Sequence, residues 1–226
     1  MKKLIELLSS HNFYPIMGEP LSNQNTTKLD FSPANAALSK IDLSKTIEFN
    51  AYVFGQLISK NKKFGIGGYL EQRAIYGRSP VFALDQLNFR NIHLGIDIWV
   101  EAGQPIFVPL PGKVHSFMDN AGFGNYGPTI ILEHELDGVT FFTLYGHLMV
   151  NDIKLIKVGT YFQAGDHFCH VGPFPENGDW PPHLHFQLMT DMDGNWGDFP
   201  GVCSLGELPK FREICLDPDL ILSADL

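Results

Sequence analysis

The sequence predicts a mostly β fold, in which an antiparallel, sandwich-like sheet domain follows an N-terminal α+β elaboration. From residue 92 onward, short runs that alternate apolar and polar residues are separated by glycine and proline at close intervals. This region lacks the rhythm of strands alternating with long helices that is typical of a parallel α/β sheet. We expect the elaboration to cover residues 1–90 and the main domain residues 91–226.

The N-terminal elaboration is expected to contain helices. Residues 1–10 have the composition of a short amphipathic helix. Over Ser44–Lys60 apolar residues recur with a period of about 3.6, which favours a second helix. The run Tyr52–Phe54 within it would equally suit a strand.

The main domain is expected to be a series of short strands. The predicted strands are Ile106–Val108, Lys113–Phe117, Thr129–Glu135, Val139–Tyr145, Leu155–Val158, Tyr161–Phe162, Phe168–Val171 and His183–Met189. Asp137-Gly138 separates two of them and has the composition of a tight hairpin turn. Such hairpins make neighbouring strands antiparallel.

Composition and charge argue against several kinds of partner and location. The 226-residue chain is 44% hydrophobic, as in a globular protein, and its net charge of −9 leaves no basic face for nucleic acid or an anionic membrane. The apolar run near the N-terminus is interrupted by Glu6, unlike a signal peptide, and nothing approaches the roughly 20 apolar residues of a membrane span. The 3 cysteines lack CxxC spacing, which fits a reducing compartment. We expect a cytoplasmic protein that binds neither nucleic acid nor a membrane.

Two segments place metal-binding side chains on one face of a strand. In His93-Leu94-Gly95-Ile96-Asp97, alternation directs the imidazole and the carboxylate to the same side, and the central glycine leaves room for an ion. In His183-Leu184-His185-Phe186 the same alternation pairs the two histidines. His147 follows another predicted strand. A lone histidine on a strand is usually structural, but two such groups in one β domain indicate a site.

Histidine and aspartate side chains in this number suit a catalytic zinc site, which needs three protein ligands and one open position. We expect such a site to lie in a surface cleft. Because His183 and His185 share a face, spacing alone does not decide which of them binds the metal.

Three separated motifs resemble the lysostaphin-like (LytM-type) zinc endopeptidases. HxGxD occurs at residues 93–97, GH at 146–147, and HxH followed by an aromatic residue at 183–186. The resemblance covers about residues 91–190 and implies a small, mostly antiparallel β domain.

The same resemblance implies roles for the individual residues. Zn²⁺ is the implied cofactor, with His93, Asp97 and His185 as its ligands. His183 is then the general base or the group that orients water, and His147 helps to stabilise the oxyanion. The implied function is that of a zinc metalloendopeptidase-like hydrolase of peptide or amide bonds, and the alternative is a zinc-containing ligand-binding or structural module without turnover.

A finer resemblance concerns the substrate. Gly67–Arg73, Glu176–Pro182 and Gly197–Gly201 are similar to a peptidase-like module of cytosolic fusion proteins, where it lies between a phosphotransferase-like domain and an aminotransferase domain. Exported family members instead cut peptide bridges of bacterial cell walls. The expected substrate is therefore a peptide or a small amide, with peptidoglycan-derived peptides among the candidates.

The stretch before the first motif supplies a further expectation. Tyr69, Glu71 and Arg73 share a face if residues 69–73 form a strand, and such polar residues are unusual for a core. We expect them to border the substrate cleft. The alternative is an exposed strand that carries a surface ion pair.

Overall fold

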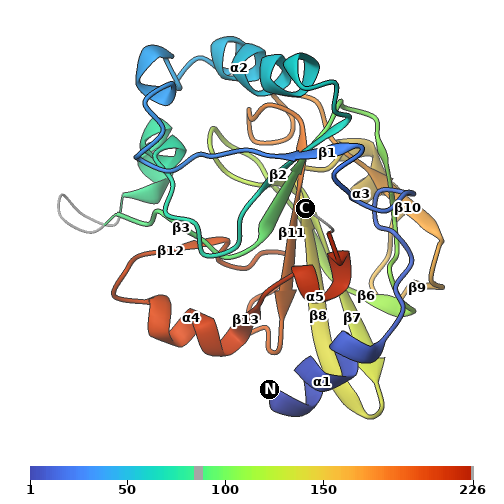
Figure 1. The fold of residues 1–226 in the computed structure, drawn as a ribbon. Coiled ribbons are helices and arrows are strands. Elements are labelled where there is room, and N and C mark those ends of the chain that lie inside the picture. The colour runs from blue at the N-terminus through green and yellow to red at the C-terminus, as the bar shows by residue number, and fades with distance from the viewer. Residues whose placement is uncertain (84–88, 225–226) are drawn as a thin grey trace.

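The computed structural model describes residues 1–83 and 89–224, and most of its regular structure is β (Figure 1). The strands are β1 (Thr26–Lys28), β2 (Phe64–Gly67), β3 (Ile92–His93), β4 (Ile96–Trp99), β5 (Pro105–Phe107), β6 (Gly112–Asn120), β7 (Gly127–Leu136), β8 (Val139–Gly146), β9 (Tyr161–Phe162), β10 (His167–His170), β11 (His183–Met189), β12 (Val202–Cys203) and β13 (Cys215–Leu216).

Helices are short and lie around the strands. They are α1 (Lys2–Ser10), α2 (Thr46–Ser59), α3 (Val150–Leu155), α4 (Leu208–Ile214), α5 (Asp219–Leu222) and 3₁₀ turns at Leu38–Lys40, Ile75–Arg78 and Pro80–Phe82. Both helices predicted in the N-terminal residues are confirmed by α1 and α2. Within the described ranges, no helix has the length and apolar character needed to cross a membrane.

The strands form one large mixed sheet that is mainly antiparallel, as the sequence predicts. It has 9 strands in the order β1-β2-β4-β11-β8-β7-β6-β9, with β13 also paired to β11. The β1–β2 pair is parallel, and the pairs from β2 to β9 are antiparallel. Two smaller sheets join β10 to β5 and β12 to β3. Because β2 pairs with β4, residues before and after position 91 contribute to the same sheet.

Apolar side chains pack on both sides of β4. Ile98 belongs to a core cluster that also contains Leu4 and Leu8 of α1. Its neighbour Trp99 points the other way, into an aromatic cluster covered by α2, which lies at the top of Figure 1. The alternation of side chains along a strand explains this division, and it places Asp97 on the same side as Trp99.

One predicted strand is wrong. Leu155–Val158 is instead the end of α3 followed by a turn. In this stretch Leu155 is 85% exposed, whereas Ile156 is buried. A segment that buries so few of its apolar side chains runs over the surface, and its alternating pattern has no buried face to define a strand.

The β7–β8 hairpin confirms the predicted turn and allows a direct test of it. Both central residues have positive φ, 48° at Asp137 and 73° at Gly138, as a primed two-residue turn requires. We expect Gly138→Ala to lower the free energy of unfolding by about 1 kcal/mol, because a Cβ disfavours this conformation. Gly55→Ala, in open space on α2, should instead raise it by about 0.5–1 kcal/mol. Urea denaturation of both variants measures their free energies of unfolding. A change in the same direction in both variants would contradict this account of the turn.

Candidate metal centre

Three side chains from different strands converge beneath the aromatic cluster. His93 ends β3, Asp97 lies on β4, and His185 lies on β11 directly opposite Asp97. One donor atom from each falls within a group whose members all lie within 4.8 Å of one another. All three residues are buried. The first and third predicted motifs therefore meet in space.

The donor atoms form a compact triangle. Asp97 Oδ1 lies 3.2 Å from His93 Nε2 and 3.0 Å from His185 Nδ1. The two ring nitrogens are 2.9 Å apart. These are the atoms that a shared metal ion would contact.

Hydrogen bonds to the other ring nitrogens orient both imidazoles. His93 Nδ1 donates to the carbonyl oxygen of Gly68 at 3.0 Å, and His185 Nε2 donates to Gln187 Oε1 at 2.9 Å. Since a carbonyl oxygen can only accept, these partners place the protons and leave the lone pairs of His93 Nε2 and His185 Nδ1 facing the triangle. Such partners typically fix the tautomer of histidine ligands.

Gly95 explains why the first motif contains a glycine. A Cβ at this position would lie 2.7 Å from His185 Cε1 and 2.7 Å from the carbonyl oxygen of Phe186. The space that Gly95 leaves is therefore taken by the ring of His185 and the backbone of β11, rather than kept for an ion.

His183 and His147 lie beside the triangle but outside it. His183 Nε2 is 3.9 Å from Asp97 Oδ1, and its ring stacks on Trp99 at a centroid distance of 4.0 Å. The rings of His147 and His183 are 4.1 Å apart. Nδ1 of His183 donates to the carbonyl of Pro181 at 2.8 Å, and Nδ1 of His147 to that of Asn177 at 2.7 Å. Both Nε2 atoms are thus free to accept a proton.

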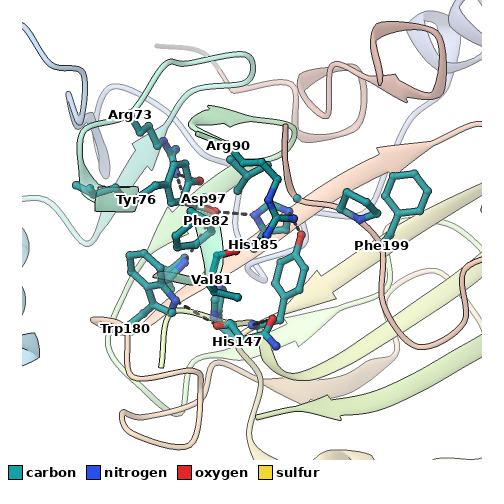
Figure 2. Close-up of a pocket in the computed structure, with 18 of the residues that line it drawn as sticks. Arg73, Tyr76, Val81, Phe82, Arg90, Asp97, His147, Trp180, His185 and Phe199 are labelled. Carbon is teal, nitrogen blue, oxygen red and sulfur yellow. Dashed lines mark hydrogen bonds and ion pairs between the residues drawn. The ribbon is translucent and has the colours of Figure 1, made fainter. Parts of the chain in front are cut away.

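The candidate ligands and the two further histidines lie deep in a partly open cavity. The five histidine and aspartate side chains are between 0% and 6% exposed, and the cavity has a volume of about 260 Å³. Several aromatic side chains line this cavity, and they come from segments outside the motifs (Figure 2). They include Tyr76, Phe82, Tyr126, Trp180 and Phe199.

Of the three residues expected at the border of the cleft, Arg73 lines this cavity. Tyr69 and Glu71 line a separate hollow, and the Tyr69 hydroxyl donates to the carbonyl of Cys215 at 2.6 Å. The stretch forms a turn in which Leu70 has a φ of 57°, not a strand, so the alternation that grouped the three does not apply. Arg73 donates to Asp97 Oδ2, a contact that strand periodicity could not predict.

Burial and neighbouring charges shift the pKa values of the site. Burial lowers the pKa of His93 to about 3 and that of His183 to about 4. Burial also holds the pKa of His147 well below its usual value. For Asp97 burial acts in the opposite direction, but the Arg73 guanidinium opposes it, and the carboxyl pKa lies well below its ordinary range. Before a metal binds, the site therefore holds one carboxylate beside the neutral imidazoles of His93, His147 and His183.

These shifts predict how the stability of the metal-free protein depends on pH. Each imidazole has a pKa near 6.5 in the unfolded chain. Below that pH the unfolded chain binds protons that the folded protein excludes, so the free energy of unfolding should fall on acidification, by about 1.4 kcal/mol per pH unit for each such histidine. The window extends from about pH 6.5 down to the folded values of about 3 for His93 and about 4 for His183.

Urea denaturation of the metal-free protein between pH 7.5 and 5 measures this dependence. His134 provides a matched control away from the site, because burial lowers its pKa to about 4 as well. His134→Gln should reduce the dependence of the free energy of unfolding on pH by about 1.4 kcal/mol per pH unit, which corresponds to one proton. The contribution of His93 and His183 should stay in place. A stability that stays constant over this range would show that the buried histidines do not titrate as described.

The donor set fits zinc. Imidazole nitrogen and carboxylate oxygen are ordinary zinc ligands, and two histidines with one aspartate provide the three protein ligands of a catalytic site. The predetermined tautomers direct lone pairs to a common point.

Comparison with known proteins adds a family. Residues 91–195 match the model of peptidase family M23. This matched stretch contains all three motifs. A comparison with curated protein sequences finds no match.

Solved structures similar to the chain include peptidases. The catalytic domain of lysostaphin from Staphylococcus simulans is 26% identical, with 54% of this chain and 80% of that one covered and a TM-score of 0.35. Full lysostaphin is 28% identical over 59% of this chain and 44% of its own, with a TM-score of 0.36. A zinc-containing peptidase from Vibrio cholerae is 23% identical over 47% of this chain and 30% of its own, with a TM-score of 0.34. The chain thus spans less than half of the last two proteins. The family model and the three motifs agree over residues 91–195, which are similar to peptidase family M23.

Proposed function

We propose that the protein is a zinc metallopeptidase that hydrolyses peptide or amide bonds. The observation that carries this proposal is the buried triangle of His93, Asp97 and His185 beside two further histidines with free Nε2 atoms. The first set supplies the ligands, and the second supplies groups that move protons. Zinc, when bound, supplies Lewis-acid activation of a water molecule and of the carbonyl group of the scissile bond.

His183 is the better placed of the two for the general base. Its Nδ1 is held by the carbonyl of Pro181, so Nε2 carries the lone pair. Its ring is fixed between Trp99 and His147, which limits its rotation. Nε2 takes a proton from the attacking water and then returns it to the leaving amine.

His147 acts on the oxyanion under one condition. Because Nδ1 donates to the carbonyl of Asn177, the neutral ring offers only a lone pair at Nε2. It can donate a hydrogen bond to the developing oxyanion only when it carries a second proton. The negative charge of that oxyanion raises the proton affinity of a neighbouring imidazole, so the two events support each other.

The cavity favours a small substrate. Its volume of about 260 Å³ lies below the range of roughly 300–1,000 Å³ that is usual for drug-sized ligands. The ligands lie deep in this cavity, with aromatic side chains among its walls. We therefore propose a short peptide or a small amide as the substrate, and short peptides derived from peptidoglycan are among the candidates.

Metal content and hydrolysis rate, measured side by side, test the assigned roles. We expect His185→Ala to be metal-poor and therefore inactive, because it removes a ligand. His183→Ala should keep near-stoichiometric zinc but lose about 10²–10⁴-fold in kcat, as is typical when a general base is removed. His147→Ala should also keep its zinc and lose activity. Elemental analysis and turnover of a mixed peptide library provide the two readouts.

The outcomes distinguish the candidate functions. A metal-poor His183→Ala with a metal-replete His185→Ala would reverse the two roles. Stoichiometric zinc in the unmodified protein with no hydrolysis of any peptide in the library would support the alternative, a binding or structural module without turnover.

Substrate length provides a separate test. We expect peptides of a few residues to be cleaved with a higher kcat/KM than the same sequences placed in the middle of long chains, because a cavity of about 260 Å³ holds only a small substrate. Mass spectrometry of both digests with equal enzyme measures the ratio. Equal cleavage of both forms would require an open groove and would contradict the small-substrate proposal.

A further inference from the structure

A loop outside the family-matched residues contacts two of the three candidate ligands. The Gly67–Arg73 loop begins at the last residue of β2, Gly67, which is paired with Asp97 across the β2–β4 ladder. The carbonyl of Gly68 accepts the hydrogen bond of His93 Nδ1. Backbone bonds join Leu70 and Glu71 to His93 as well, at 2.8 Å and 3.0 Å. The loop is thus bound to the strand that carries the first ligand.

Arg73, the last residue of the loop, is fully buried beside the site. Its side chain is 0% exposed. Nη1 donates to Asp97 Oδ2 and, at 3.2 Å, to the Tyr76 hydroxyl (Figure 2). Nε donates to Glu71 Oε2 at 2.8 Å, and Glu71 Oε1 in turn accepts from the backbone amide of Phe31 at 3.0 Å. The guanidinium therefore joins two carboxylates and is held at both ends.

The backbone of the loop makes room for this guanidinium. A Cβ on Gly67 would lie 2.6 Å from Arg73 Nη2. Any other residue there would push the guanidinium away from Asp97. The ring of Phe31 lies 5.6 Å from the guanidinium carbon and covers it from another side.

The arrangement divides the two oxygens of Asp97 between two functions. Oδ2 is engaged by Arg73, while Oδ1 faces His93 and His185. A carboxylate without such a partner could rotate or offer both oxygens. Arginine is suited to this task because its planar fork holds several donors in a fixed geometry, whereas lysine is a single flexible point charge.

We propose that Arg73 is a positioning residue of the metal centre, which holds Oδ2 so that Asp97 presents Oδ1 to the zinc ion. Glu71 fixes the guanidinium in turn. The inference rests on the proposed function, because it requires zinc at the triangle. It makes the Gly67–Arg73 loop part of the centre, although the loop lies outside residues 91–195.

The test is the zinc affinity of the full chain, measured by competition with a chelator, beside the unfolding of the metal-free protein. We expect Arg73→Met to bind zinc about 10–100-fold more weakly, the usual cost of removing a partner of a metal ligand. Arg73→Lys should lose less, because an ammonium keeps the charge but not the fork. Glu71→Gln should weaken binding without abolishing it. The visible absorption of the cobalt-substituted Arg73→Lys protein should also change, since cobalt reports on the ligand geometry.

Arg78 provides the matched control, a second buried arginine of the N-terminal residues. It donates to Thr46 Oγ1 at 2.8 Å and lies over the Trp180 ring at 4.5 Å, without a contact to Asp97. Arg78→Met should lower stability and leave zinc affinity unchanged.

The results separate this inference from the proposed function. Unchanged affinity in both Arg73 variants, or an equal loss in Arg78→Met, would overturn the positioning role while the zinc site stands. If Arg73→Met fails to fold, Arg73→Lys and Glu71→Gln decide in the same way. An unmodified protein that binds no zinc would overturn the proposed function, and this inference with it.

Discussion

The antiparallel pairing of β4 with β11 is the constraint on which the site depends. It places Asp97 opposite His185, so that one register brings two candidate ligands together. It also places Trp99 opposite His183, and the two rings stack. A shift of one residue would turn every one of these side chains to the other face of the sheet. Gly95 allows the approach, since a side chain there would collide with His185.

The same pairing buries a carboxylate, and much of the surrounding structure compensates for it. Taking Asp97 out of water is costly unless the charge is paired and hydrogen-bonded. Arg73 and the imidazoles provide these partners, and Glu71 balances the arginine. Aromatic residues then close over the group, with Phe31 and Trp99 among the fully buried side chains. Burial keeps His93 and His183 neutral, and neutral imidazole is the form that binds zinc or accepts a proton.

The family-matched residues and the remaining parts of the chain contribute differently to this site. Residues 91–195 carry every histidine and aspartate to which we assign a role. The N-terminal residues supply the Gly67–Arg73 loop, which contacts His93 and Asp97, and the wall that includes Tyr76 and Phe82. The candidate ligands therefore lie within the family-matched residues, while the walls of the cavity come both from these residues and from segments outside them.

The sequence by itself determined the fold class and the candidate ligands. Alternation and turn composition predicted β6, β7, β8 and β11, because these strands are long enough for a period of two to be read. It failed at Leu155–Val158, which has no buried face. It also did not predict β2, a four-residue strand rich in glycine whose β structure depends on pairing with β4.

Only the tertiary structure decided how the site is enclosed and which groups support its ligands. The contact of Gln187 with His185 can be predicted from sequence, because strand alternation puts Gln187 on the same face as His183 and His185. The contact of Arg73 with Asp97 cannot, because it spans 24 residues and depends on a turn with a positive φ, not on a repeating pattern. A local period records which side of an element a residue faces, whereas the partner across a cavity is set by how distant segments pack.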